Sequence, residues 1–135
     1  MKKILLTGSN GFIGSNLLQY LSKNYKIYAI LRKKNKNTYK NKNINQIYFN
    51  NYEKLNIKLK LINVDVVIHC ATHYIKNHNQ TDIKKLVNSN ILLGNILLEN
   101  LKKMRVKKFI NFSTVWENYD GKKDNFYNLY SVYKK

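Results

Sequence analysis

Three glycines near the N-terminus are regularly spaced, and their positions suit the binding of an anion. Gly8, Gly11 and Gly14 follow the apolar segment 3–6 and open a segment whose apolar residues recur at helical spacing. A glycine-rich turn between a strand and a helix N-terminus presents backbone N–H groups to an anion, and the helix dipole favours negative charge there. Glycine lacks the Cβ that would block close approach of a diphosphate. The run predicts a dinucleotide-binding turn; an ordinary turn with chance glycines is the alternative.

A tyrosine and a lysine four residues apart, Tyr130 and Lys134, stand near the other end of the sequence. Residues at this spacing share a face of a helix. An ammonium group near a phenol stabilises the phenolate, which lets a tyrosine act as a general acid or base. Because the chain contains 11 tyrosines, the pair is informative through its place after the fifth expected strand rather than through its spacing alone.

The rest of the sequence alternates between apolar segments of strand length and amphipathic segments of helix length. Alternation of this kind predicts the α/β class, with a doubly wound parallel sheet (Rossmann fold) and right-handed crossovers. Its ligand site lies at the carboxyl ends of the strands, where the strand order reverses between the first and fourth strands. The expected strands are 3–6, 26–31, 45–49, 65–70 and 108–113, and the expected helices are 11–23, 52–62, 82–103 and a last one from about 127.

Five segments in order resemble the extended short-chain dehydrogenase/reductase family, the NAD-dependent epimerase/dehydratases of nucleotide sugars. TGSNGFIG is similar to the family's T-G-x-x-G-F-I-G, and DVVIHCAT is similar to its fourth strand. Gly94 stands one place later than in the family's N-x-x-G helix. Five matches in the right order are more specific than any one of them. The segments are 7–14, 65–72, 90–99, 109–114 and the pair Tyr130 and Lys134.

The resemblance implies a role for each matching residue. Tyr130 would exchange a proton with a sugar hydroxyl or keto group, and Lys134 would stabilise its phenolate and hold the nicotinamide ribose. Thr114 would hydrogen-bond the reacting oxygen, with Ser113 as the alternative; a loop-capping role for Thr114 is also open. The implied cofactor contacts are Gly8, Asn10, Gly11, Phe12, Ile13, Gly14, Arg32, Ala71, Thr72, Asn90, Tyr130 and Lys134.

The end of the second expected strand bears on the choice of cofactor. NAD-binding relatives place an acidic residue there to hold the ribose diol, whereas this sequence has Arg32, Lys33 and Lys34. Since a guanidinium pairs well with a 2′-phosphate, we expect NADP in preference to NAD, unless Arg32 is only a surface cation. Asn50 or Asn51 is the candidate for a contact with adenine.

The composition narrows the other function classes. Lys and Arg number 25 against 7 Asp and Glu, a net charge of +18 that attracts polyanions. Lysines are scattered, and the densest run, 33–37, falls in an expected loop, so we expect no specific nucleic-acid binding.

No apolar run approaches the length of a membrane span, and we expect a cytoplasmic protein. Cys70 cannot form an internal disulfide. His69, His73 and His78 lack metal-ligand spacing, so no metal is predicted.

Length is the main departure from the family pattern. Family members continue with a sixth strand and a C-terminal domain that holds the nucleotide sugar. At 135 residues we expect one NAD(P)-binding Rossmann domain over 1–135, truncated after about five strands and without the substrate domain. The resemblance implies an NAD(P)-dependent epimerase, dehydratase or reductase that is too short to be active alone, unless a homodimer or a complementing chain supplies the rest.

Three further readings of the sequence remain open. The chain could be a non-catalytic dinucleotide-binding module or remnant, and a basic nucleic-acid-binding protein is the weakest alternative. Among substrates, residues 116–119 followed by 127–130 are similar to reductases and epimerases of CDP-linked deoxysugars.

Overall fold

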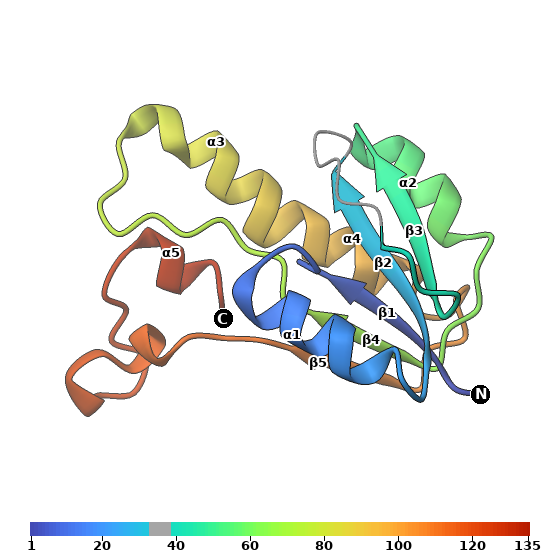
Figure 1. Ribbon diagram of the computed structural model, residues 1–135. Helices are drawn as coiled ribbons and strands as arrows, with labels where there is room; N and C mark the ends of the chain where they lie inside the picture. Colours follow the sequence, from blue (N-terminus) through green and yellow to red (C-terminus); the bar gives the residue numbers. More distant parts are fainter. Residues whose placement is uncertain (33–38) are drawn as a thin grey trace. The chain divides into compact units, whose positions relative to one another are not determined.

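The computed structural model describes residues 1–32 and 39–135, which form two compact units (Figure 1). Unit 1 comprises residues 1–71 and 96–111, and unit 2 comprises residues 72–95 and 112–135. The basic run 33–37 lies outside the described residues.

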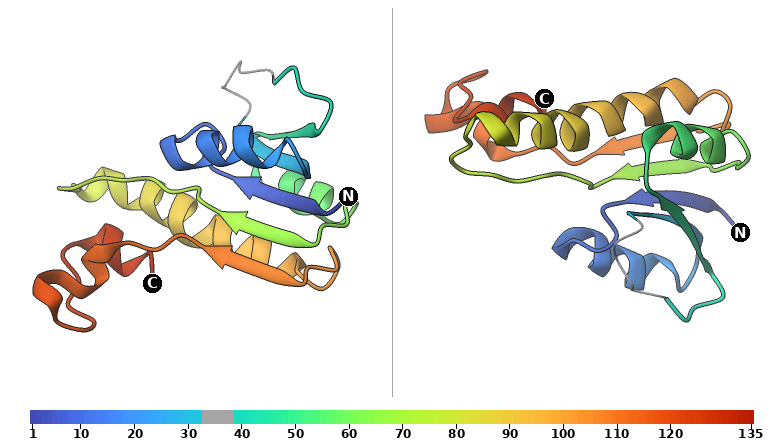
Figure 2. Two further views of the ribbon diagram at one scale, coloured as in Figure 1. Left: turned by 60° about the horizontal axis from the view of Figure 1, so that its bottom comes forward. Right: turned by 90° about the horizontal axis from the view of Figure 1, so that it is seen from above.

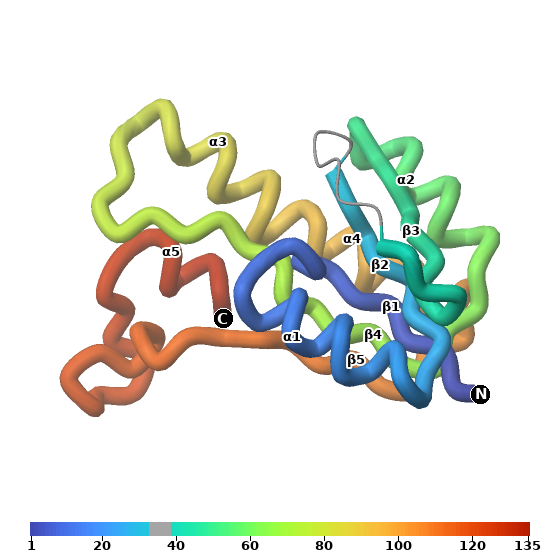
Figure 3. The backbone as a smooth tube through the Cα atoms, viewed as in Figure 1, coloured from blue at the N-terminus to red at the C-terminus, as the bar shows by residue number. Residues whose placement is uncertain are grey.

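Unit 1 contains a five-stranded sheet in which every neighbouring pair is parallel (Figure 1). The strand order is β3-β2-β1-β4-β5, so the order reverses between β1 and β4. This confirms the predicted Rossmann fold and its switch point. The backbone passes from β1 through the glycine-rich turn directly into α1 (Figure 3). The strands are β1 Lys3–Thr7, β2 Lys26–Arg32, β3 Ile44–Phe49, β4 Val66–His69 and β5 Lys108–Asn111.

Helices cover both faces of this sheet. Helix α1 (Phe12–Leu21) lies on one face, and α2 (Tyr52–Leu59) lies on the other with the unit 1 end of α4 (Leu93–Asn100) (Figure 2). The apolar strands are buried on both sides, as in other parallel sheets. The completely buried side chains of unit 1 include Leu5, Leu6, Leu18, Ile27, Leu31, Leu55, Leu59, Val67, Leu97 and Met104.

Unit 2 is made of short helical elements and their connections. The helix expected over about 82–103 is present with its ends shifted by two or three residues, but it is not a single regular helix. It begins at Gln80, ends at Asn100 and contains a π-helical segment. The other expected elements are present, with bounds shifted by up to three residues. The elements not yet named are η1 Gln80–Asp82, α3 Ile83–Leu86, η2 Val87–Leu92, η3 Val115–Gly121 and α5 Leu129–Val132.

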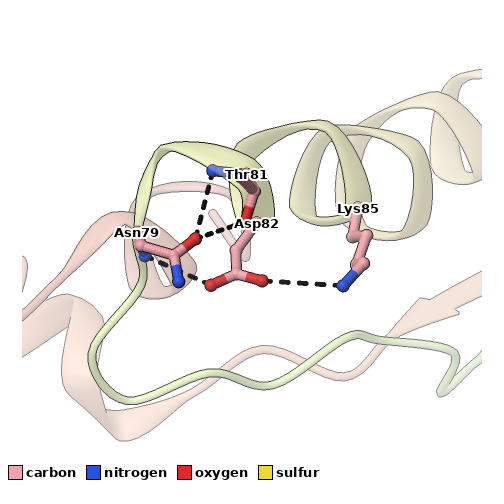
Figure 4. Close-up of polar contacts among 4 residues, drawn as sticks. All are labelled: Asn79, Thr81, Asp82 and Lys85. Carbon is pink, nitrogen blue, oxygen red and sulfur yellow. Dashed lines mark hydrogen bonds and ion pairs between the residues drawn. The ribbon is translucent and has the colours of Figure 1, made fainter.

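The early start of that helical segment has a local cause (Figure 4). The Asn79 carboxamide oxygen accepts hydrogen bonds from the Thr81 amide at 3.1 Å and from the Thr81 hydroxyl at 2.6 Å. The Asp82 carboxylate in turn accepts from the Asn79 amide at 3.2 Å and pairs with Lys85 at 3.7 Å. Such a reciprocal capping box satisfies amides that the first helical turn leaves unpaired. Asp82 is therefore part of the cap rather than the first residue of the helix.

Candidate functional site

The glycine-rich turn of unit 1 requires glycine at two of its three predicted positions. Gly8 has a φ of +71°, and a Cβ there would lie 2.7 Å from the Ala71 backbone nitrogen. A Cβ at Gly14 would lie only 2.1 Å from the Gly8 carbonyl oxygen. Gly11 is less constrained, since its Cβ would lie 3.3 Å from that same oxygen. The turn is thus closed tightly on itself and against Cys70 and Ala71, which follow β4.

Thr7 joins the carboxyl ends of β1 and β4 at the switch point. Its buried hydroxyl lies 2.7 Å from Nδ1 of His69 and accepts a hydrogen bond from the Ala71 amide at 3.1 Å. Sequence reasoning did not give Thr7 a role, although a polar residue at the end of an apolar strand was visible directly before Gly8. His69 is buried in this contact, and the described residues contain no group of three His, Cys, Asp or Glu side chains able to hold a metal.

The turn and the start of α1 carry polar groups that suit an anionic ligand. The Ser9 hydroxyl oxygen is buried and has no hydrogen-bond partner in the described part of the chain. Gly11 is the N-cap of α1 and provides no side-chain cap. Among the described residues, no acceptor is recorded for the amides of Phe12, Ile13 and Gly14. Helix N-terminal amides and a hydroxyl donor fit the diphosphate of a dinucleotide.

Two further polar side chains of unit 1 are Arg32, at the end of β2, and Tyr39, which contacts the glycine-rich turn. Arg32 is exposed at the end of β2, and its Nη2 donates to the Tyr52 hydroxyl at 3.4 Å. The Tyr39 hydroxyl lies 2.7 Å from Oδ1 of Asn10 and 3.2 Å from the Ser9 carbonyl oxygen. Burial raises the pKa of Tyr39 further above neutral, and the protonated phenol is the donor in these contacts. Sequence reasoning missed Tyr39, because nothing in an Asn- and Lys-rich loop distinguished it.

Unit 2 brings together two of the expected cofactor contacts, Thr72 and Asn90. The Asn90 carboxamide oxygen accepts from the Thr72 hydroxyl at 3.1 Å and from the His73 amide at 2.7 Å. Its nitrogen donates to the His73 carbonyl at 3.0 Å. Asn90 therefore holds the segment that follows residue 71 in a fixed conformation.

Ser113 and Thr114 lie in unit 2 just after β5. The Thr114 hydroxyl accepts from the Trp116 amide at 3.4 Å and is the N-cap of η3, which matches the loop-capping alternative. The Ser113 hydroxyl is within hydrogen-bonding distance of the Glu117 carboxylate, and it lies 3.1 Å from the Lys134 carbonyl oxygen. Both hydroxyls thus have hydrogen-bond partners within unit 2.

Tyr130 is surrounded by aromatic rings of unit 2. It is only 9% exposed and meets Tyr74 edge to face at 5.1 Å between ring centroids, with Trp116 similarly oriented at 6.3 Å. Trp116 also packs on Tyr127 at 5.2 Å. These contacts fix the plane of the Tyr130 ring. Helix α5 comprises a single turn, so Lys134, which is buried, follows that helix rather than lying on it. The expectation that the two side chains act as a pair stays a prediction.

A doubly wound parallel sheet with a glycine-rich turn at its switch point defines the Rossmann fold class. The model of the NAD dependent epimerase/dehydratase family matches residues 4–131, and the chain belongs to this family. None of the helices among the described residues combines the length and apolar character that crossing a membrane requires.

Individual relatives agree with this membership. CDP-abequose synthase of Salmonella muenchen is 33% identical over 120 residues, which cover 88% of this chain and 40% of that protein. dTDP-D-glucose 4,6-dehydratase of Dictyostelium discoideum is 32% identical over 126 residues, and the match covers 84% of this chain and 29% of that protein. A Bacillus cereus UDP-glucuronic acid 4-epimerase, solved with UDP-glucuronic acid and NAD, superposes with a TM-score of 0.80 at 28% identity. The superposition covers 98% of this chain and 48% of the epimerase chain. The chain therefore spans less than half the length of these relatives.

Proposed function

We propose that this chain forms the cofactor-binding part of an NAD(P)-dependent enzyme that epimerises, dehydrates or reduces a nucleotide-linked sugar. The glycine-rich turn is the observation that carries the proposal. It combines amides at the start of α1 with a buried Ser9 hydroxyl, none of which has a recorded hydrogen-bond acceptor or partner among the described residues, at the point where the strand order reverses. Buried polar groups normally have partners, and a ligand phosphate would satisfy these.

The chemistry that we assign to unit 2 centres on Tyr130. A bound nicotinamide supplies hydride exchange with a sugar carbon. The phenol of Tyr130 donates a proton to the oxygen on that carbon or accepts one from it, and Thr114 hydrogen-bonds the same oxygen. Lys134 stabilises the phenolate and holds the nicotinamide ribose. The aromatic rings around Tyr130 support this assignment because they restrict its motion and its access to water.

Arg32 underlies a finer proposal, that NADP is preferred to NAD. Its exposed guanidinium ends β2, where an acidic side chain would otherwise hold the ribose diol. Solved structures similar to this chain contain NAD, so the proposed preference for NADP rests on Arg32 alone.

For the substrate, we propose a CDP-linked deoxysugar. CDP-abequose synthases from two organisms are similar to this chain at 33% identity. The chain spans less than half the length of such relatives. We therefore propose that the remaining substrate-binding residues come from further sequence, from the second copy in a homodimer or from a complementing chain. We likewise propose that residues 1–135 function as one Rossmann domain of such an enzyme.

Titration with NADPH and NADH, followed by nicotinamide fluorescence and thermal unfolding, tests the cofactor proposal. Ligand at a hundredfold excess over Kd should stabilise the chain by about 2.7 kcal/mol. Gly11→Val should weaken binding by about tenfold or more, because a displaced turn loses charge-assisted hydrogen bonds. Gly121→Ala is the control for nucleotide binding, because an added Cβ there meets no atom within 4 Å and only its φ of +70° makes the substitution costly.

Arg32→Gln should weaken NADPH binding more than NADH binding, with the exposed Lys84→Gln as its charge-matched control. A folded chain that binds neither nucleotide would overturn the cofactor proposal and favour an inactive remnant. Equal loss of both nucleotides in Arg32→Gln would overturn only the preference for NADP.

A further inference from the structure

Tyr39 contacts the glycine-rich turn although it stands in a different loop. Its hydroxyl lies 2.7 Å from the Asn10 carboxamide oxygen, which is short enough for a well-formed O–H···O hydrogen bond. The Ser9 carbonyl, at 3.2 Å, is the more distant acceptor for the same proton. The side chain of Tyr39 is half-buried, so this contact is partly shielded from water.

The hydrogen bond from Tyr39 matters because Asn10 lies next to the start of α1. Asn10 directly precedes the N-cap Gly11, and asparagine is among the best side-chain acceptors for helix N-terminal amides. A short amide side chain at such a place competes for the backbone N–H groups near it. The amides of Phe12 to Gly14 are the donors that the proposed site offers to a diphosphate. A released Asn10 side chain would therefore compete with the ligand for the same donors.

We propose that Tyr39 is a positioning residue of the dinucleotide site, whose hydroxyl holds the Asn10 carboxamide oxygen away from the start of α1. The proposal rests on the proposed cofactor site and adds to it a residue outside the glycine-rich run. The open amides cost stability in the free protein, and the Tyr39 hydrogen bond compensates for part of that cost. The ligand then meets amides that are already available, which lowers the cost of binding.

The test compares Tyr39→Phe with Tyr20→Phe, since Tyr20 is 70% exposed and lies on α1 without a recorded polar contact among the described residues. Tyr39→Phe should raise the Kd for NADH and NADPH by about three- to tenfold, the range of one hydrogen bond, and Tyr20→Phe should not change it. In an Asn10→Ala background, Tyr39→Phe should have no further effect on Kd, because the competing side chain is gone.

A second measurement needs no nucleotide. Amide hydrogen exchange of Phe12, Ile13 and Gly14, followed by NMR in the free protein, should slow in Tyr39→Phe, where Asn10 can cap them, and return to the wild-type rate when Asn10→Ala is added. Unchanged exchange in Tyr39→Phe, or a Kd effect that persists in the Asn10→Ala background, would overturn the proposal, as would tighter binding by Tyr39→Phe. If the wild-type chain binds no nucleotide, the proposed function fails, while the exchange rates still decide the role of Tyr39.

Discussion

Unit 1 and unit 2 hold their functional residues in place by different means. In unit 1 the glycine-rich turn is fixed by backbone contacts and by strands whose side chains are completely buried. In unit 2 the residues around Tyr130 are fixed by side-chain hydrogen bonds and by edge-to-face aromatic contacts. The side-chain caps of unit 2 come from Asn79, Thr114, Asn128 and Ser131, and Asn90 hydrogen-bonds the backbone of His73.

This difference predicts where each unit is vulnerable. Burial of a large apolar side chain contributes about 1.5–3 kcal/mol, whereas a typical hydrogen bond contributes about 0.5–1.5 kcal/mol net. Unit 1 should therefore tolerate loss of a polar contact but not a steric change at its turn, and unit 2 should lose order when single polar side chains are removed. Trp116, the one tryptophan of the sequence, lies in unit 2 and reports on that unit by fluorescence.

The largest effect is expected for Gly14→Ala in unit 1. Its new Cβ would lie 2.1 Å from a backbone oxygen that cannot move aside without opening the turn. We expect a loss of about 3 kcal/mol in the free energy of unfolding, the upper end of overpacking costs, measured by urea unfolding followed by circular dichroism. Gly121→Ala in unit 2 is the comparison, where open space leaves only the cost of a positive φ, about 1 kcal/mol. Equal losses of unfolding free energy in Gly14→Ala and Gly121→Ala would mean that close backbone contacts do not make unit 1 more sensitive than unit 2.

A smaller and more local effect is expected for Asn90→Ala in unit 2. The substitution removes the three hydrogen bonds to Thr72 and His73. We expect a loss of about 1–2 kcal/mol, with faster amide exchange confined to the segment after residue 71. Asn95→Ala on the same helical segment is exposed and serves as the control. If Asn90→Ala behaves like Asn95→Ala, side-chain hydrogen bonds do not order unit 2.

The sequence was most predictive where hydrophobic periodicity and backbone geometry determine the structure. The apolar strands and the spacing of Gly8 and Gly14 follow from local rules, and the alternation of elements was enough to predict the reversal between β1 and β4. The bounds were less predictable, because a side-chain cap such as Asn79 moves the start of a helix without altering its apolar pattern.

The sequence was least predictive for contacts between segments far apart in the chain. Tyr39 meets Asn10 across about thirty residues, and no pattern in either segment indicates it. Asn90 was identified through the resemblance to the family, but its hydrogen bonds with Thr72 and His73 became visible only in the structure. The aromatic rings around Tyr130 come from three separate segments, so their convergence depends on the fold rather than on local spacing.

The smallest change in stability is expected when a polar contact of unit 1, made by Asp65, is removed. The Asp65 carboxylate accepts from the Lys3 amide at 2.9 Å and pairs with Lys107 at 3.5 Å. The Lys3 amide hydrogen bond, with help from Lys107, lowers the pKa of Asp65. A lowered pKa in the folded state stabilises the fold above the unfolded-state value near 4, and this stabilisation is lost as the pH falls through the folded-state pKa.

Asp65→Asn should therefore lower the thermal midpoint slightly at pH 7, and the difference from wild type should shrink below about pH 4. Glu99→Gln, at an exposed carboxylate of α4, is the control for the removal of one negative charge. A fall in the midpoint as large as that of Gly14→Ala would contradict the proposed contrast, because a single polar contact would then matter to unit 1 as much as the geometry of its turn.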